Sequence, residues 1–245
     1  MKITVLCFEL ARMIAETHRS VSKDKVRTTM CGICFDFTGN MLKLVATDTH
    51  RMSISTLPGI ESEPVKFVLL TADVLAVKKI LGRIGDCRIT ITDDAIAFRT
   101  QKGAHVAARN THQFPNYARI IPADTYIHVI CPRAELLSAF KEVMAGKPAI
   151  DRCRVTVNGT FAISGIPLDG AGVSSSAYVR WDRNPLGITE FLFAVNGKYA
   201  IDVIASIPGP TVRFQFMNTN LRPMIIDSPE CTSQAFHIVM PMQLD

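Results

Sequence analysis

The sequence lacks the features that mark membrane proteins, secreted proteins and the common nucleotide and metal sites. No apolar run reaches the roughly 18 residues that a membrane-spanning helix requires. Glu9 and Arg12 interrupt the N-terminal segment before the apolar part of a signal sequence could form. The sequence also has no G-x-G-x-x-G, P-loop or zinc-finger pattern. We therefore expect a cytoplasmic protein with no membrane partner, no cofactor and no metal.

The seven cysteines are few, odd in number and spread along the chain. Only Cys31 and Cys34, in "CGIC", have a spacing found in metal sites. This segment has the pattern of a strand, in which positions three apart face opposite sides of the sheet. A zinc or redox site would also need a second pair or a helix after the motif. We expect reduced, buried thiols.

Aromatic residues make up 7% of the chain and do not alternate with basic ones, which argues against stacking on single-stranded nucleic acid. The net charge of +5 comes from 27 basic and 22 acidic residues. This mild excess is compatible with attraction to phosphates, but an ordinary solvated surface explains it as well.

The 245 residues contain a repeat with a period of about 124. "ITVLCFELARMIAETHRSV" near the N-terminus is matched by "IHVICPRAELLSAFKEVMAG", and "KFVLLTADVLAVKKILGRI" by "EFLFAVNGKYAIDVIASIP". Each segment predicts a strand followed by an amphipathic helix. We expect N-caps at Thr71 and Asn196, and Pro132 in the first turn of its helix.

Alternating segments between and after these pairs predict antiparallel strands, among them "MLKLVATD", "RITITDD", "AIAFRT", "VRFQFMN" and "FHIVMPM". "RVTVNGTFAIS" carries an Asn-Gly hairpin turn. The fold class is therefore α+β, with two similar domains at 1–123 and 124–245, each with two helices packed on antiparallel sheets.

Basic side chains lie on the expected polar faces of the helices and in the loop after the first helix. Acidic residues on the same faces dilute the bias. Nucleic acid would bind here by phosphate attraction without base reading, and the alternative is a solvated helix surface. The residues are Arg12, Arg19, Lys23, Lys25, Arg27, Lys78, Lys79, Arg83, Arg133, Lys141 and Lys198.

Asp48, His50 and Arg51 lie close together in "VATDTHRMSI", which raises acid–base catalysis as a hypothesis. Strand alternation would place Asp48 and His50 on one face. No nucleophile or metal partner accompanies them by pattern. The alternative is a polar turn that closes a strand pair, with His50 and Arg51 hydrogen-bonded to neighbouring loops.

Three separated segments, "VATDTHRM", "QFPNYARIIP" and the terminal "VMPM", resemble in order and spacing the bacterial DNA polymerase III β subunit (sliding clamp) family. The resemblance covers essentially the whole chain, but only the middle and last of the three domains of that family. It implies the DNA-clamp fold, in which six domains close a pseudo-sixfold ring with helices lining the hole. A chain of two such domains, whether a fragment or a natural two-domain clamp, would then form a head-to-tail homotrimer rather than the bacterial dimer.

The resemblance implies a DNA polymerase processivity factor and not an enzyme. Such a clamp encircles double-stranded DNA without sequence specificity and binds a DNA polymerase and a clamp loader through a short peptide motif on each partner. The alternatives are a ring-incompetent fragment or decoy that binds the same peptides, and a hydrolase using Asp48 and His50. Carried over by position, the peptide-binding pocket consists of Met30, Thr47, Thr49, His50, Arg51, Met52, Pro115, Arg119, Ile120, Ile238, Val239, Met240, Pro241, Met242 and Gln243.

Several positions depart from the family pattern. Thr49 replaces the usual glycine, Met30 the usual leucine and Gln243 the terminal arginine, and Asp245 follows the usual last leucine. The threonines at 28–29 stand where the family has paired tyrosines that help hold DNA. We infer an altered client preference and weaker DNA contact through this loop.

Overall fold

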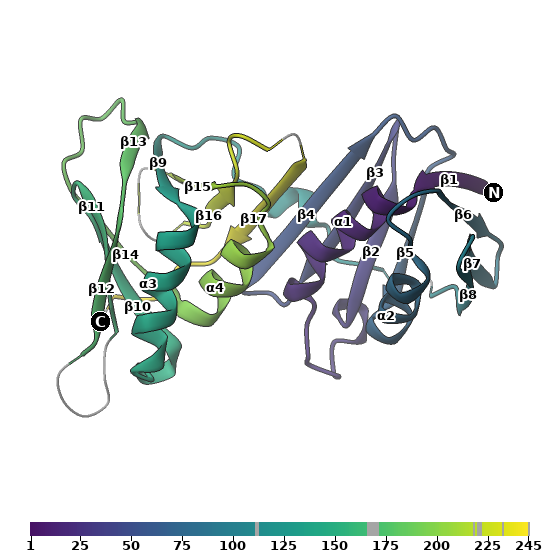
Figure 1. The fold of residues 1–245 in the computed structure, drawn as a ribbon, viewed down its shortest axis with the longest axis horizontal. Helices are drawn as coiled ribbons and strands as arrows, with labels where there is room; N and C mark the ends of the chain where they lie inside the picture. Colours follow the sequence, from purple (N-terminus) through teal and green to yellow (C-terminus); the bar gives the residue numbers. More distant parts are fainter. Residues whose placement is uncertain (111–112, 166–171, 218, 220–221, 232, 245) are drawn as a thin grey trace. The chain divides into compact units, whose positions relative to one another are not determined.

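The computed structural model describes residues 1–110, 113–165, 172–217, 219, 222–231 and 233–244 (Figure 1). The chain divides into two compact units. Unit 1 holds Met1–Tyr117 together with Ser233–Ala235, and unit 2 holds the rest of the described residues. The division falls after Tyr117, whereas the sequence pattern places the domain boundary after residue 123. Each unit contains one copy of the sequence repeat.

Unit 1 contains two α-helices and two sets of antiparallel strands. One set has the order β1-β6-β7-β8, and in the other β5, β2, β3 and β4 pair in that order. The helices are α1 (Cys7–Thr17) and α2 (Thr71–Ile80), with the short 3-10 turns η1 (His18–Ser20) and η2 (Thr28–Met30). The strands are β1 (Lys2–Leu6), β2 (Gly32–Phe37), β3 (Met41–Thr47), β4 (Arg51–Pro58), β5 (Val65–Leu70), β6 (Asp86–Ile91), β7 (Ala95–Thr100) and β8 (Gly103–Ala108).

The core of unit 1 follows from the predicted periodicities. Leu10, Met13 and Ile14 recur at helical spacing on α1 and are fully buried against the sheets. The stacked rings of Phe35 and Phe67, with centroids 5.1 Å apart, join β2 to β5 inside this core. The predicted helix is thus confirmed.

One local prediction in unit 1 is wrong. Leu70, not Thr71, occupies the N-cap position of α2, and Thr71 is the first helical residue. The Thr71 hydroxyl donates a hydrogen bond of 2.7 Å to the carbonyl oxygen of Cys31, which lies 40 positions earlier. This long-range contact takes the side chain away from the helix amides.

Unit 2 repeats the plan of unit 1. Its strands pair in the orders β12-β11-β10-β14 and β13-β9-β15-β16-β17, and the helices α3 (Arg133–Ala145) and α4 (Gly197–Ser206) run side by side (Figure 1). The 3-10 turns are η3 (Tyr117–Ile120) and η4 (Ala149–Asp151). The strands are β9 (Ile127–Pro132), β10 (Arg152–Val157), β11 (Thr160–Gly165), β12 (Ser174–Tyr178), β13 (Arg180–Arg183), β14 (Phe191–Asn196), β15 (Thr211–Phe216), β16 (Met224–Asp227) and β17 (Gln234–Val239).

In unit 2 the structure confirms the predicted helix cap and hairpin turn, and it differs at Pro132. Asn196 caps α4, because its side-chain oxygen accepts hydrogen bonds from the backbone amides of Lys198 and Tyr199 at 3.0 and 3.1 Å. Gly159, with φ of +98°, supplies the predicted hairpin turn between β10 and β11. Pro132 differs from its predicted place, since it stands at the N-cap position, one residue before α3.

Among the described residues, no helix is long and apolar enough to span a membrane. The same residues contain no cluster of three or more His, Cys, Asp or Glu side chains that could hold a metal ion. Cys31 and Cys34 are free thiols, and burial raises the pKa of Cys34 to about 12, which makes its thiolate form rare at neutral pH.

Candidate functional site

The turn between β3 and β4 holds the centre of the predicted peptide-binding residues in unit 1. The Asp48 carboxylate accepts hydrogen bonds from the backbone amides of His50 and Arg51 at 3.1 and 3.0 Å. Its other oxygen accepts one from Nε of Arg51 at 2.9 Å. The Thr47 hydroxyl donates to the carbonyl oxygen of Arg51 at 2.8 Å and accepts from the amide of Thr49 at 3.2 Å. The turn is therefore held by its own polar groups.

The bonds of Asp48 favour a structural role over acid–base catalysis. Arg51 and Asp48 form an ion pair whose side chains are only 7% and 13% exposed. Asp48 thus caps the turn with both carboxylate oxygens, which is a structural role. The arrangement fits the polar-turn alternative and gives Asp48 no nucleophile to activate among its hydrogen-bond partners in the described part of the chain.

Thr49 has φ of +78°, a left-handed backbone conformation that glycine adopts without cost and β-branched residues rarely adopt. This conformation gives a physical reason for the glycine that the family pattern shows here. The exposed Thr49 hydroxyl accepts a hydrogen bond of 3.3 Å from the guanidinium of Arg27. The threonine therefore adds both strain and a contact to the basic loop before η2.

The other predicted residues of unit 1 are less accessible. Met52 on β4 is buried, and Met30, at the end of η2, and Pro115 are half-buried. Phe114 and Tyr117, which flank Pro115, are buried and fix the segment that follows β8.

Tyr117 is fixed by a group of residues that sequence reasoning missed. Its hydroxyl donates to Oδ2 of Asp36 on β2 at 2.6 Å, and Nζ of Lys66 lies 2.8 Å from the same oxygen. Burial acts to raise the pKa of Asp36, but hydrogen bonds from Lys66, Thr38 and Tyr117 outweigh it, so the pKa lies below its usual value. Burial, and then the bond to Asp36, raise the pKa of Tyr117.

The predicted residues of unit 2 lie in η3 and at the end of the chain. Arg119 and Ile120 are exposed in η3. Ile238 and Val239 are buried, and Val239 belongs to the unit 2 core. A client peptide therefore cannot contact these two side chains directly. The accessible part of the tail is Met240–Gln243, in which Met240 is 39% exposed. Asp245 lies outside the described residues.

The tail is held in place through its backbone. The amide of Met242 donates to the carbonyl oxygen of Ala194 on the edge of β14 at 2.8 Å. From β10, Arg152 donates to the carbonyl oxygen of Gln243 at 3.2 Å, and Arg154 to that of Leu244 at 3.1 Å. Because these bonds use main-chain oxygens, they fix the path of the tail whatever side chains it carries.

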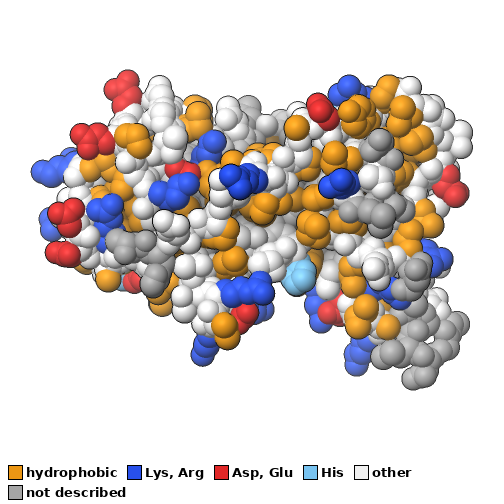
Figure 2. Space-filling view, turned by 180° about the vertical axis from the view of Figure 1, so that it is seen from behind, with side chains coloured by type: hydrophobic (Ala, Val, Ile, Leu, Met, Phe, Trp, Pro, Cys, Tyr) orange, Lys and Arg blue, Asp and Glu red, His pale blue; other side chains and the backbone are white. Residues whose placement is uncertain are grey.

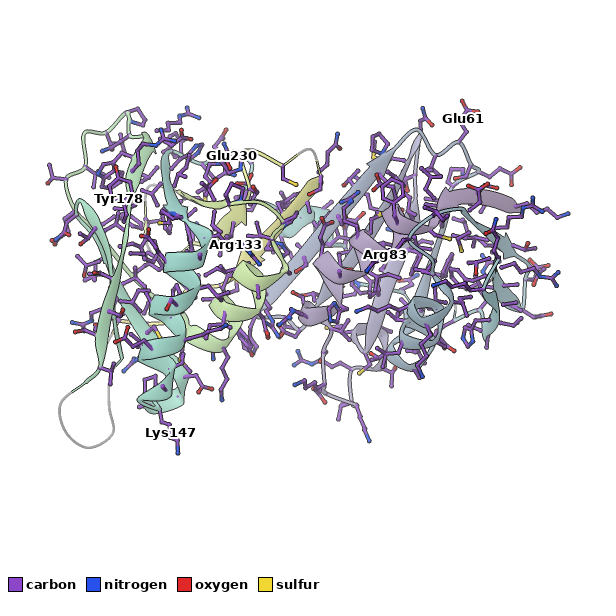
Figure 3. All side chains as sticks on the ribbon, in the orientation of Figure 1. Glu61, Arg83, Arg133, Lys147, Tyr178 and Glu230 are labelled. Carbon is purple, nitrogen blue, oxygen red and sulfur yellow. The ribbon has the colours of Figure 1, made fainter. Side chains whose placement is uncertain are left out.

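Several of the predicted DNA-facing residues are engaged by the protein itself, among them Arg27, which donates a hydrogen bond to Thr49 and lies 3.7 Å from a carboxylate oxygen of Asp24. Arg12 lies between Glu9 and Glu16 and pairs with both carboxylates. Arg133, between α3 and α4, donates to the carbonyl oxygens of Ile204 and Ala205 at the end of α4 at 3.0 and 3.2 Å (Figure 3). Lys198 lies 2.9 Å from a carboxylate oxygen of Asp151.

Arg27 and the remaining predicted DNA-facing residues are exposed. In unit 1 they lie in η1, in the loop before η2, on α2 and just after it, and in unit 2 Lys141 lies on α3. Lys78 lies near His18 at the end of α1. The pKa of His18 is lowered, first by burial and then by the positive charge of Lys78. Figure 2 shows the side opposite to the one seen in Figure 1, where Lys and Arg side chains are interspersed with Asp, Glu and apolar ones. The exposed set is Arg19, Lys23, Lys25, Arg27, Lys78, Lys79, Arg83 and Lys141.

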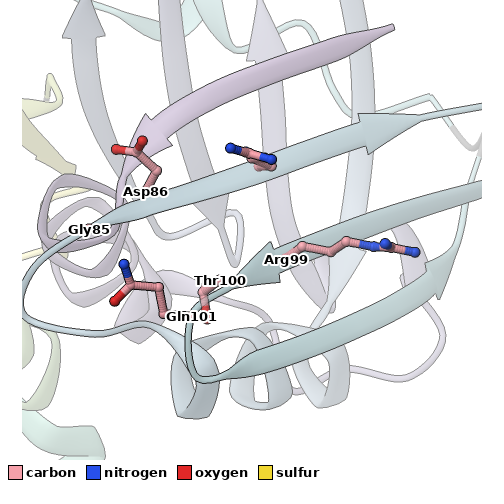
Figure 4. Close-up of a pocket in the computed structure, with 6 residues that line it drawn as sticks. Gly85, Asp86, Arg99, Thr100 and Gln101 are labelled. Carbon is pink, nitrogen blue, oxygen red and sulfur yellow. The ribbon is translucent and has the colours of Figure 1, made fainter.

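Two depressions on the β1-β6-β7-β8 sheet, of about 340 and 570 Å³, involve none of the predicted residues. The smaller one is lined by Gly85, Asp86, Arg88, Arg99, Thr100 and Gln101 (Figure 4). Both include Arg88 and Arg99.

Comparison with known proteins finds that the chain is similar to subunits of bacterial sliding clamps. A family model described as the central domain of the DNA polymerase III beta subunit matches residues 5–116. The beta sliding clamp of Salmonella typhimurium is 25% identical over 249 residues, covering 96% of this chain and 63% of that protein. The beta sliding clamp of Lactococcus lactis is 26% identical over 263 residues, covering 99% and 64%. The chain thus spans a little less than two thirds of these relatives.

Solved structures agree on the fold. The DNA polymerase III beta subunit of Thermotoga maritima gives a TM-score of 0.89 at 20% identity and covers 100% of this chain and 66% of that chain. The subunit from Borrelia burgdorferi gives 0.91 at 19% identity, covering 100% and 65%. The α+β sliding-clamp fold therefore extends over the whole chain, which corresponds to about two of the three clamp domains.

Proposed function

Because the chain belongs to the DNA polymerase III β sliding-clamp family, which is non-enzymatic, we propose that it is a DNA polymerase processivity factor acting in the cytoplasm. The observation that carries the proposal is the clamp fold over the full length of the chain. The internally satisfied Asp48 turn supports binding rather than catalysis. In this role the protein encircles double-stranded DNA and tethers a polymerase to it.

Clients dock on the predicted residues of the two units. In unit 1 the β3–β4 turn offers Thr49 and His50 at its exposed tip, and in unit 2 the tail offers Met240 and Pro241. Methionine side chains suit the Leu and Phe anchors of a client peptide, because they are flexible and polarisable.

Fluorescence anisotropy with a labelled peptide carrying Leu and Phe anchors tests this docking. Replacing Met240 and Met242 by alanine is expected to weaken binding by about tenfold or more, since buried anchors dominate peptide affinity. The control is Leu186→Ala, another exposed apolar residue of unit 2, at 55% exposure. Equal affinities for the Met240/Met242 variant and the control would contradict the proposed site.

DNA is retained by enclosure rather than by tight contact. The exposed cations of α2 and of the loop before η2 attract phosphates without reading bases. Binding to short linear duplexes is expected to be weak and to fall steeply as salt rises. Tight, sequence-dependent binding to a linear duplex would contradict this role.

Enclosure requires copies of the chain to assemble head to tail. β8 is an edge strand in unit 1 and β12 in unit 2, and edge strands pair readily with a second copy. A six-domain ring built from this chain contains three copies. A monomer that still binds client peptides would instead indicate a ring-incompetent decoy.

A further inference from the structure

The outward face of the β1-β6-β7-β8 sheet carries a group of cations that belong neither to the predicted peptide-binding residues nor to the predicted DNA-facing residues. Strand alternation sends Ile3, Ile89 and Phe98 into the unit 1 core. It leaves Lys2, Thr4, Arg88 and Arg99 exposed on the opposite side of the sheet. α1 and α2 pack on the core side of unit 1, so neither of these helices covers this face.

Arg88 and Arg99 are direct partners in the antiparallel ladder of β6 and β7. Like charges directly opposite each other destabilise a sheet. Among the described residues, neither guanidinium has a carboxylate within 4.0 Å. Lys2 lies opposite Thr90, two residues from Arg88 on the same face, which adds a third positive charge nearby.

Asp86 is the single acidic residue among those lining the two depressions. Figure 4 shows the Arg99 side chain extending away from the Asp86 carboxylate. The face therefore has three cations against one anion. It also has the hydroxyls of Thr4 and Thr90, which can donate hydrogen bonds to an oxyanion.

We propose that this face, which we name the arginine face (Lys2, Thr4, Arg88, Thr90 and Arg99), docks an extended acidic segment of a partner protein. Alternate side chains of an extended peptide are about 7 Å apart. Cross-strand and diagonal neighbours in a sheet are about 5–8 Å apart. Successive carboxylates at alternate positions can therefore each meet a cation, and guanidinium groups bind carboxylates with paired, charge-assisted hydrogen bonds.

The occupant is distinct from the DNA of the proposed function. The helices that carry the DNA-facing cations of unit 1 lie on the other side of this sheet, so one duplex does not contact both. The inference does not depend on the clamp function and applies to unit 1 alone.

The variant Arg99→Glu is expected to change peptide affinity and thermal stability in opposite directions. It places a carboxylate opposite Arg88, so the like-charge pair becomes an opposite-charge pair, and the midpoint of thermal unfolding is expected to rise. Anisotropy with a fluorescein-labelled (Glu-Ser)5 peptide is expected to show a loss of affinity of about tenfold or more, because two charge-assisted contacts are lost or repelled. A gain in stability together with a loss of binding excludes unfolding as the cause.

The matched control is Lys102→Glu, which makes the same charge change in the β7–β8 turn, outside the arginine face. It is expected to leave peptide affinity within about twofold, since a single exposed charge contributes little. Three outcomes would overturn the proposal: no binding of the peptide by the unmodified chain, equal losses in the two variants, or displacement of the peptide by an equal charge concentration of inorganic pyrophosphate or duplex DNA.

Discussion

The hydroxyl of Tyr117 donates a hydrogen bond of 2.6 Å to Oδ2 of Asp36 across 81 positions of sequence. Lys66 completes the group, with Nζ 2.8 Å from the same oxygen and 5.2 Å from the centre of the tyrosine ring. The bond fastens the last residues of unit 1 to the middle of its sheet. The "FPNY" motif therefore has a structural role as an anchor, beside any contact that Pro115 makes with a client.

Replacing Tyr117 by phenylalanine tests this anchor. The ring stays buried, but Asp36 loses one of the donors that stabilise its charge, so we expect the free energy of unfolding to fall by about 2 kcal/mol. Urea denaturation measures the change. Tyr126→Phe is the control, because Tyr126 is 38% exposed, and it is expected to stay within about 0.5 kcal/mol of the parent. Equal effects of the two changes would remove the anchor role.

The lowered pKa of Asp36 predicts a dependence of stability on pH. As pH falls below about 5, the unfolded chain begins to take up a proton at the ordinary Asp pKa near 4, while the folded chain does not. The stabilisation by Asp36 is therefore present above that ordinary value and is lost as pH falls through the lower folded pKa. Asp36→Asn is expected to flatten the decline in unfolding free energy over this acid range. A decline as steep as that of the parent would contradict the assignment.

Thr49→Gly is expected to stabilise the protein. The left-handed backbone costs a non-glycine residue about 1–2 kcal/mol, whereas the extra freedom of glycine in the unfolded chain costs about 0.5–1 kcal/mol. The weak bond from Arg27 is lost, so we expect a net gain of about 0.5 kcal/mol in chemical denaturation. Thr56→Gly makes the same change within β4 and is expected to destabilise. A loss of stability in both variants would show that position 49 is not strained.

Replacing Arg152 and Arg154 by alanine is expected to free the tail. NMR of the methionine methyl groups should show sharper signals for Met240 and Met242, because the carbonyl oxygens of Gln243 and Leu244 lose their donors. If clients dock on the tail, their affinity should fall several-fold, since the free tail must be ordered on binding. Arg183→Ala, an exposed arginine on β13, serves as the control. Unchanged methyl signals would contradict the role of these arginines independently of client binding.

Local patterns predicted the helices and most strands, because apolar periodicity is itself what buries Leu10, Met13 and Ile14. The same patterns predicted an N-cap at both Asn196 and Thr71, but only Asn196 caps its helix. Asn196 bonds to amides two and three residues away, whereas Thr71 bonds to a carbonyl 40 positions away. Sequence patterns contain the first kind of contact and not the second.

In the candidate site, too, the sequence indicated local contacts but not long-range ones. The partners of Arg12 lie three and four residues away on its own helix, so this pairing was visible in the sequence at helical spacing. Arg133 meets α4 more than 70 positions later, and Asp36 carries no local mark of its bond to Tyr117. The arrangement of the tail likewise depends on β10 and β14, which only the fold brings beside it.

The solution mass of the 245-residue chain, measured by native mass spectrometry or light scattering at micromolar concentration, tests the proposed clamp most directly. A closed ring of six domains predicts one stable species of three 27.0 kDa chains, about 81 kDa. β8 and β12 carry no Asp, Glu, Lys or Arg, so introducing a lysine at Val106 of β8 or Ser176 of β12 should reduce that mass if these edge strands join the copies as proposed. A stable monomer, or a mass that fits a dimer, would contradict the homotrimeric ring.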